Sequence, residues 1–213
     1  MAGERGQKKV KDKWREKNWY TIVSPAYMGG KEIAMSPGNS PEGMIGRKIE
    51  TPVSDLTGNF KKAGVKAVFR ITGCQGTRCE TEFVGHFVGD DYVRRMVRRR
   101  KERMDVVTRA RTNDGYTVSV KAVIVTDNKL TNSRKATIRK NSREALDSKA
   151  ASMSLGEFAA YMIGDEAQAM ISSVNKDIYP LKKIEVRKSE VMGRSEMGSN
   201  VAPEPIQEPE PVQ

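Results

Sequence analysis

The chain has 213 residues and is strongly basic, with 38 lysines and arginines against 27 acidic residues and a formal net charge of +11. Residues 196–213 hold four glutamates and no basic residue, so removing these four negative charges from +11 leaves +15 for the rest. Such a charge favours phosphates, in nucleic acid or on an anionic membrane. No apolar run approaches the roughly 20 residues of a membrane-spanning helix. The composition therefore predicts a nucleic-acid partner and no membrane.

Both ends of the chain are predicted to lie outside the folded domain. Residues 1–17 are polar and basic, with too little apolar sequence to fold alone, and are expected to order on a partner. Residues 194–213 end in repeated Pro-Glu and are expected to stay disordered. Residues 18–193 form the predicted domain between them. The charged N-terminus lacks a secretory signal and the chain has two cysteines, which together favour a reducing, cytoplasmic location.

Strands are predicted for much of the first half of the domain. Order is expected to begin at residues 19–23, where aromatic and β-branched residues cluster, whereas residues 25–46 are rich in Gly, Pro and Ser and predict a loop or weak structure. Residues 45–53 are a short strand candidate. Residues 65–72 and 79–88 predict two strands joined by a turn.

The strongest functional signal lies in residues 90–104, which predict a helix. At helical spacing the apolar residues fall on one side, which can pack on a core: Tyr92, Val93, Met96, Val97 and Met104. The other side presents basic residues: Arg94, Arg95, Arg98, Arg99, Lys101 and Arg103. Arginine matches phosphate oxygens two at a time, so such a row predicts binding to a nucleic-acid backbone. A merely solvated helix face is the alternative, but such faces usually mix charges of both signs.

The second half of the domain predicts a hairpin, three helices and a last strand. Asp114-Gly115 lies between two β-rich runs, residues 106–112 and 116–126, and is a strong hairpin signal. The later elements are expected at residues 133–153, 154–163, 165–174 and 182–192. Ser154 and Glu157 predict a capping box at the start of the second helix. The expected fold class is α+β, an antiparallel β-barrel or strongly curved sheet with flanking helices.

Two further groups are candidates for RNA contact. On the first of the three helices lie Arg134, Lys135, Arg139, Lys140 and Arg143, and spacing puts Lys135, Arg139 and Arg143 on one face, for which a solvated surface is the alternative. In the N-terminal extension lie Lys8, Lys9, Lys11, Lys13 and Lys17. The nearby Trp14, Trp19 and Tyr20 could stack on unpaired bases. For Trp19 and Tyr20, however, burial in the core is the favoured interpretation.

Catalytic and metal-binding motifs find little support. His86 is the only histidine, and it has no recognisable nucleophile or orienting acid, so a structural or surface role is expected. Cys74 and Cys79 with His86 lack the fourth ligand of a structural zinc site, and packed or exposed thiols are the expected state. Asp90 and Asp91 predict the acidic first turn of the basic helix rather than a metal pair. The sequence therefore predicts no enzyme, no cofactor and no metal.

Five short motifs occur in an order that resembles a known family. They are Lys17-Asn18-Trp19-Tyr20, Arg98-Arg99-Arg100 followed by Arg103-Met104-Asp105, Asn113-Asp114-Gly115-Tyr116, Ile138-Arg139-Lys140, and Ile178-Tyr179-Pro180-Leu181 leading to Val186-Arg187-Lys188. Together they resemble the archaeal and eukaryotic small-subunit ribosomal protein family written eS-one, also called S-three-Ae, over about residues 14–192. The length and short acidic tail are similar to archaeal members. One departure is Ser119, where many members have a basic residue.

The resemblance implies a β-barrel-centred structural protein on the platform of the small ribosomal subunit. It implies binding to rRNA near the mRNA exit, contact with neighbouring small-subunit proteins and mRNA, and no enzymatic activity. The family's basic positions correspond to Arg98, Arg99, Arg100, Arg139, Lys140, Arg187 and Lys188. The expected function is that of a structural constituent of the ribosome in translation. A free RNA-binding regulator or rRNA-processing factor is the alternative.

Overall fold

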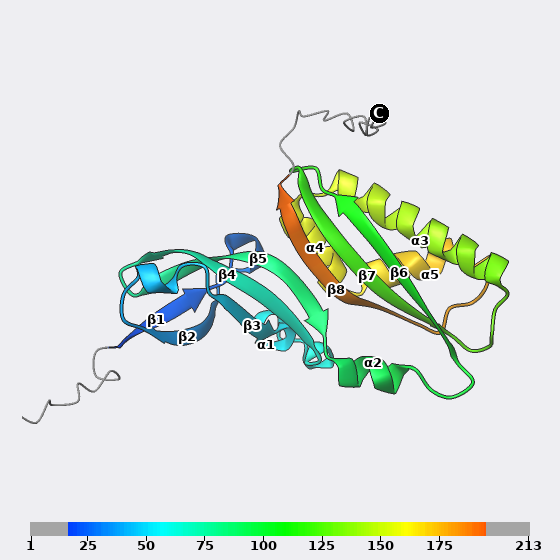
Figure 1. Cartoon of the computed structure of the whole chain (residues 1–213), viewed down its shortest axis with the longest axis horizontal. Coiled ribbons are helices and arrows are strands. Elements are labelled where there is room, and N and C mark those ends of the chain that lie inside the picture. Colours follow the sequence, from blue (N-terminus) through cyan, green and yellow to red (C-terminus); the bar gives the residue numbers. More distant parts are fainter. Residues whose placement is uncertain (1–16, 195–213) are drawn as a thin grey trace, which may run out of the picture.

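The computed structural model describes residues 17–194, apart from the side chain of Lys61. The predicted N-terminal extension, except Lys17, and the predicted acidic tail, except Arg194, lie outside the described residues. So do the candidate contacts Lys8, Lys9, Lys11 and Lys13, and Trp14. The described part is elongated and has two halves (Figure 1).

The N-terminal half is mostly strand. It contains β1 (Asn18–Val23), β2 (Glu32–Gly38), β3 (Lys48–Pro52), β4 (Val65–Gln75) and β5 (Arg78–Val88), with the helix α1 (Val53–Thr57) and the 3-10 turns η1 (Ala26–Met28), η2 (Glu42–Met44) and η3 (Phe60–Lys62). The C-terminal half contains α2 (Asp90–Met96), β6 (Glu102–Arg111), β7 (Tyr116–Thr126), α3 (Asn132–Ser152), α4 (Leu155–Ile163), α5 (Glu166–Val174) and β8 (Lys183–Arg194). The α+β prediction is confirmed.

The eight strands found within residues 17–194 belong to one open sheet, with the order β2-β1-β5-β8-β7-β6 and with β4 and β3 attached to the other edge of β5. The start of β5 pairs in parallel with β1, and its last part, Gly85–Phe87, pairs antiparallel with β8. One edge of β5 is thus shared by β1 and β8, so the sheet divides into two halves instead of curling back on itself. The predicted closed barrel is therefore wrong.

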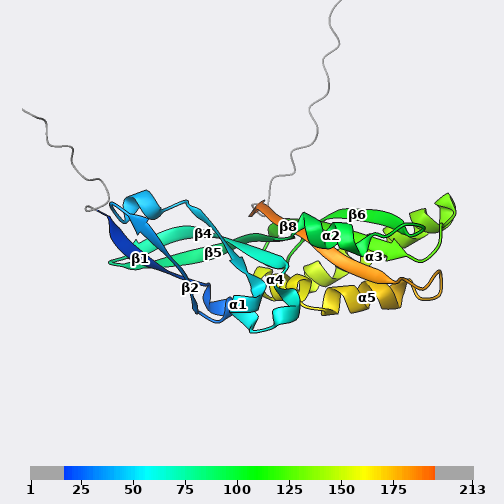
Figure 2. The ribbon, with the colours of Figure 1, turned by 90° about the horizontal axis from the view of Figure 1, so that it is seen from below.

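The main core lies between the helices and one face of β6, β7 and β8 (Figure 2). On α3 the buried residues Ile138, Ser142, Leu146 and Ala150 recur every four positions, which keeps them on one side of the helix. On β6 every second residue from Met104 to Ala110 is buried, as a strand with one covered face requires. The predicted capping box of α4 is confirmed, since the Ser154 hydroxyl accepts from the Glu157 N–H and the Glu157 carboxylate accepts from the Ser154 N–H.

The predicted basic helix is too long, because α2 ends at Met96. Met96 packs with Val123 and Val125 on one face of the sheet, whereas Met104 belongs to the core on the opposite face. A continuous helix would keep Met96 and Met104 on the same side. The chain instead turns after Met96 and enters β6, where Met104 is paired with Ile124.

The predicted loop over residues 25–46 in fact contains β2, η1 and η2. β2 pairs antiparallel with β1, and its Pro37 is tolerated because β2 lies at the edge of the sheet. The same pairing corrects the prediction for Trp19. Tyr20 is buried as expected, but Trp19 faces away from the core and is 62% exposed, because successive strand residues alternate between faces.

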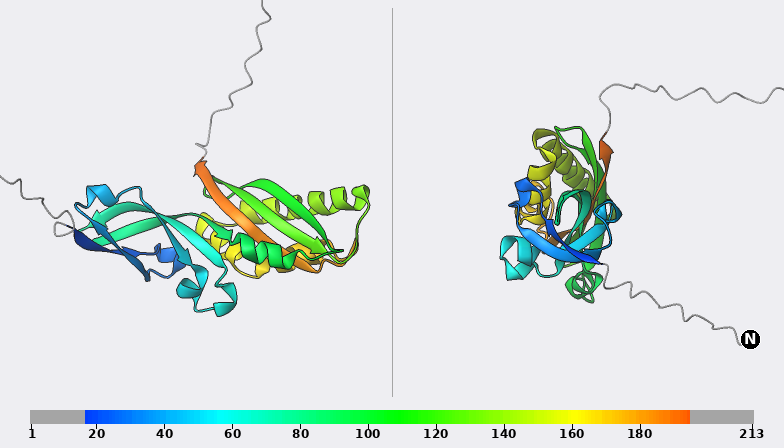
Figure 3. Two further views of the ribbon diagram at one scale, coloured as in Figure 1. Left: turned by 60° about the horizontal axis from the view of Figure 1, so that its bottom comes forward. Right: turned by 90° about the vertical axis from the view of Figure 1, so that its left-hand side faces the viewer.

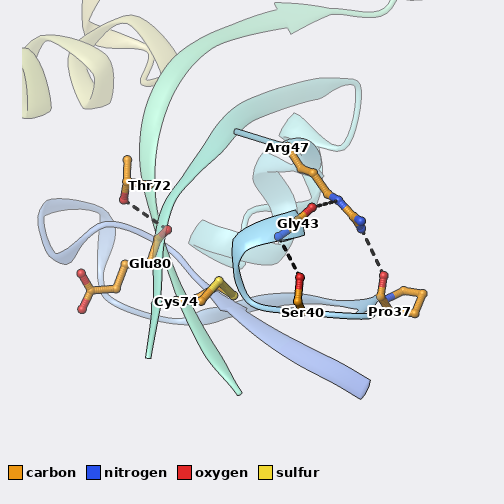
Figure 4. Close-up of a disulfide and its surroundings, with 8 residues drawn as sticks. Pro37, Ser40, Gly43, Arg47, Thr72, Cys74 and Glu80 are labelled. Atoms are coloured by element: carbon orange, nitrogen blue, oxygen red, sulfur yellow. Dashed lines mark hydrogen bonds between the residues drawn. A yellow bond between two sulfur atoms is a disulfide. The ribbon is translucent and has the colours of Figure 1, made fainter. Parts of the chain in front are cut away.

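The predicted hairpin of β4 and β5 is confirmed, and its tip carries a disulfide between Cys74 and Cys79, with 4.0 Å between their Cα atoms (Figure 4). The expectation of unpaired thiols is therefore wrong: the two residues face each other across the antiparallel strands, which brings their side chains together. Among residues 17–194 there is no cluster of three or more His, Cys, Asp or Glu side chains that could hold a metal ion.

Candidate nucleic-acid interface

The three consecutive arginines lie in a turn between α2 and β6. We call residues 97–101 the arginine loop. The chain leaves the helix at Val97, which is extended, and the Lys101 N–H donates to the Arg98 carbonyl at 3.2 Å. Arg100 has a φ of +66°, a left-handed conformation that non-glycine residues rarely adopt. All three arginines are exposed, so the turn presents them to solvent on a short, hydrogen-bonded connection.

Carboxylates beside the arginine loop hold further cations in place. Asp127 accepts hydrogen bonds from Lys101 and, at 2.8 Å, from Lys182. These two bonds, Lys101 first, lower the pKa of the Asp127 carboxyl. The same carboxylate raises the pKa of Lys182, while Arg98 acts in the opposite sense through its charge. Lys182 therefore remains charged at neutral pH, and Arg98 lies close enough to affect the pKa of Lys182.

A second carboxylate, Glu102 at the start of β6, ties the loop to α3. It pairs with Lys135 and accepts the Leu130 N–H at 2.6 Å. The Lys135 bond, the Leu130 bond and the charges of Lys135 and Lys129 all lower the pKa of Glu102. The basic end is defined as the cations of the arginine loop, those that interact with Glu102 and Asp127, and Arg134 beside Lys135 on α3: Arg98, Arg99, Arg100, Lys101, Lys129, Arg134, Lys135 and Lys182.

The structure places the other predicted residues elsewhere. Arg94 and Arg95 are exposed on α2, which packs beside the sheet on the side away from α3, α4 and α5 (Figure 3). Arg103 is held by Asp105 through two bonds of 2.9 and 3.0 Å on the open face of the sheet. Asp90 and Asp91 form the acidic first turn of α2, as predicted.

The basic residues along α3 differ in their exposure and in the groups that they contact. Lys135 turns toward Glu102, Arg139 is half-buried and Arg143 is exposed. Lys140 lies 3.9 Å from the Glu144 carboxylate one turn later. Lys135, Arg139 and Arg143 recur every four positions, so they share one side of α3 as predicted, but of these three only Lys135 belongs to the basic end.

Arg187 and Lys188 lie in the middle of β8, far along the chain from the arginine loop but on the same open face of the sheet as Arg103. Arg187 pairs with Asp90 at 2.9 Å, and Lys188 pairs with Glu190 at 2.6 Å. They form a second group, separate from the basic end.

Several basic residues were missed by the sequence prediction. Lys129 and Lys182 complete the basic end, but each is isolated in a connection and has no periodic signal. Arg109 and Arg111 are exposed on β6, and their alternation with buried Thr108 and Ala110 was a readable signal.

Arg109 also bears on the one departure from the family pattern. Ser119 lies directly between Arg109 on β6 and Glu190 on β8. The basic residue that Ser119 lacks is therefore present on the neighbouring strand, as Arg109.

The sequence matches the Ribosomal S3Ae family over residues 5–195. It is 53% identical to the small ribosomal subunit protein eS1 of Thermoplasma acidophilum over 197 residues, which cover 92% of each chain. It is 52% identical to the eS1 protein of Thermoplasma volcanium over 195 residues (92% of this chain and 91% of the relative), and 36% identical to that of Saccharolobus solfataricus over 183 residues (86% and 88%). With a match over nearly the whole length, the chain belongs to the Ribosomal S3Ae family.

Proposed function

We propose that the chain binds small-subunit rRNA as a structural component of the ribosome, with the basic end as its principal phosphate-binding surface. Its relatives are named small ribosomal subunit proteins, and the family is structural rather than enzymatic. A role in translation follows from that membership. The proposal goes beyond family membership in assigning the rRNA contact to the basic end.

The observation that carries the proposal is that the arginines of the arginine loop are not paired with carboxylates of residues 17–194. Within the described residues, Arg98, Arg99 and Arg100 form no ion pair, although two carboxylates lie close by. Those carboxylates are already occupied by lysines. The guanidinium groups are therefore free to bind phosphate oxygens in pairs, which is the geometry in which arginine binds phosphate best.

The surroundings of the loop favour binding to a rigid RNA backbone. Each end of the loop is fixed to a packed element, by Met96 in α2 and by the pairing of Glu102 with Thr126 in β7. Cations held on a folded scaffold lose little freedom when they bind, so more of the interaction appears as affinity. Helix α3, with Arg139, Lys140 and Arg143, extends the basic surface away from this end.

The remaining expectations stay predictions. They include contacts by Arg94, Arg95 and the N-terminal lysines, neighbouring ribosomal proteins as partners, and a position near the mRNA exit of the subunit. No helix within residues 17–194 is long and apolar enough to cross a membrane.

The alternative is a free RNA-binding regulator or rRNA-processing factor, and sedimentation separates the two. Ribosomal particles from cells that express a tagged copy of the chain are washed in high salt and sedimented. A structural constituent stays with the small subunit in a one-to-one ratio to other subunit proteins. A substoichiometric protein that leaves in the wash would contradict the proposal.

A further inference from the structure

A row of outward-facing side chains crosses the open face of the sheet, well away from the arginine loop. Register pairs Lys66 on β4 with Phe87 on β5, Phe87 with Lys188 on β8, Lys188 with Lys121 on β7, and Lys121 with Val107 on β6. We call these five residues the sheet-face row. Neighbouring strands are about 4.8 Å apart, so an aromatic ring and two ammonium groups lie side by side in close succession.

A β-bulge adds a further cation to this row. The register of β7 against β8 shifts between Lys121 and Ala122, which leaves Arg187 as an extra residue beside Lys188. In a regular strand one of two successive side chains would point into the core, yet Arg187 and Lys188 are both partly exposed. Bulges commonly redirect a side chain toward a functional surface.

A hollow of about 440 Å³ opens beside Phe87, and Lys121, Arg187 and Lys188 line it. Phe87 is partly exposed and has the Lys66 ammonium 5.7 Å from its ring centroid. At the far end of the row, Val107 is 46% exposed. The hollow thus combines an aromatic wall with three basic side chains.

The charges around the hollow are not balanced. Asp90 pairs with Arg187, and Glu190 alone serves both Lys188 at 2.6 Å and Lys121 at 3.6 Å. Lys121 and Lys188 are directly opposite each other on adjacent strands, an arrangement that destabilises a sheet unless an anion lies between them. One carboxylate shared by two lysines leaves room for a second anion.

We infer that the sheet-face row binds single-stranded RNA, with one unpaired base stacked on Phe87 and its phosphates held by Lys121 and Lys188. The inference rests on the proposed function, since it assumes an RNA partner. Aromatic rings on an open sheet stack unpaired bases, and flanking cations follow the backbone. A protein partner fits less well, because lysine is depleted at protein interfaces.

The test uses the full-length protein and a labelled oligouridine of about 10 nucleotides, within the usual site size of such surfaces. Phe87→Leu keeps an apolar side chain but removes the ring, and we expect oligouridine affinity to fall about tenfold. Phe87→Tyr keeps the ring and should retain the affinity. Lys121→Gln should lower the dependence of log K on log salt by about 0.7, the contribution of one phosphate of a single strand.

Phe60→Leu is the matched control, because Phe60 is 88% exposed but lies on η3, outside the row. It should leave oligouridine binding unchanged. Equal losses for Phe60→Leu and Phe87→Leu would overturn the inference, as would unchanged binding by Phe87→Leu. If Phe87→Leu binds oligouridine normally but fails to enter the small subunit, the face contacts a protein and the inference is likewise overturned.

Failure of this inference can be distinguished from failure of the proposed function. The loop variant, Arg98→Gln with Arg99→Gln and Arg100→Gln, is measured on a duplex rRNA fragment in parallel. If the loop variant loses duplex affinity while Phe87→Leu keeps oligouridine affinity, only the sheet-face inference fails. If the loop variant also binds normally, the proposed function of the basic end fails as well.

Discussion

His86 gives the protein a dependence of stability on pH that can be worked out from its contacts. The ring is buried between β5 and β8, with Nε2 3.1 Å from the Val186 carbonyl and Nδ1 2.6 Å from the Ser189 hydroxyl. In the neutral ring Nε2–H donates to Val186 and Nδ1 accepts from Ser189, so both nitrogens are satisfied. Protonation would place a charge in the core. Burial accordingly lowers the pKa of His86 from 6.5 to about 4, against the opposing effect of the Val186 carbonyl.

The sign and size of the effect follow from this lowered pKa. Above pH 6.5 the ring is neutral in both the folded and the unfolded chain, so protonation of His86 does not reduce the free energy of unfolding. Between pH 6.5 and about 4 His86 binds a proton in the unfolded chain but not in the folded chain, so the free energy of unfolding falls. The difference between the two pKa values corresponds to about 3 kcal/mol of unfolding free energy.

Urea unfolding from about pH 7 down to about pH 4.5 measures this loss, with His86→Gln as the comparison. Glutamine has no proton to gain and its amide can still donate to Val186. The variant should start from a lower stability but show a much flatter slope with pH. The carboxyls of Glu102 and Asp127, whose pKa values are lowered, lose their contribution mainly below this window and in both proteins alike. Parallel pH profiles for the two proteins would refute the reasoning.

Three further substitutions test the packing of the fold, each by thermal or urea unfolding. Met96→Asp puts a charge where α2 covers the sheet and should unfold the C-terminal half, whereas a variant with normal stability would contradict the placement of α2. Gly85→Ala places a Cβ 2.1 Å from the Ser189 carbonyl oxygen, so β5 and β8 must separate; we expect a loss of about 1–3 kcal/mol, and an unchanged midpoint would argue against this close approach. Ser154→Ala removes the cap of α4 and should cost about 1 kcal/mol, while no measurable loss would show that the capping box contributes nothing.

The elements with one dominant period were predictable from the sequence. The hairpin β6–β7 with its Asp114-Gly115 turn, the cap at Ser154 and the four-residue spacing on α3 all depend on neighbours within the segment. Near the end of β7 both faces are buried, and the apolar Val123 and Val125 in the sequence are consistent with this.

The parts that depend on distant residues could not be predicted in this way. Tyr92, Val93, Met96 and Met104 fit a helix as well as they fit a helix followed by a strand, and only pairing with β7 decides where the helix ends. Strands of open and closed sheets likewise show the same alternation of buried and exposed residues. What divides the sheet is the contact of Gly85 with β8, between residues about a hundred positions apart.

The candidate site shows the same limit. Arg98–Arg100 were identifiable from charge alone, and they form the exposed part of the basic end. The surroundings of these arginines could not be identified from the sequence, because Lys129 and Lys182 come from separate connections and meet only around Asp127 and Glu102. Charge density in a segment predicts a basic surface but not which cations are already paired.

The account depends most on the claim that the arginine loop binds rRNA phosphates. The direct measurement is the slope of log K against log salt for a duplex rRNA fragment, for the native chain, the loop variant and a control. The control, Lys48→Gln with Arg70→Gln and Arg78→Gln, also removes three positive charges, but from exposed positions in the N-terminal half. The loop variant should lower the slope by about 2.7, or 0.9 for each of three phosphates, and the control should leave it unchanged. An unchanged slope for the loop variant, or an equal change in both variants, would contradict the claim.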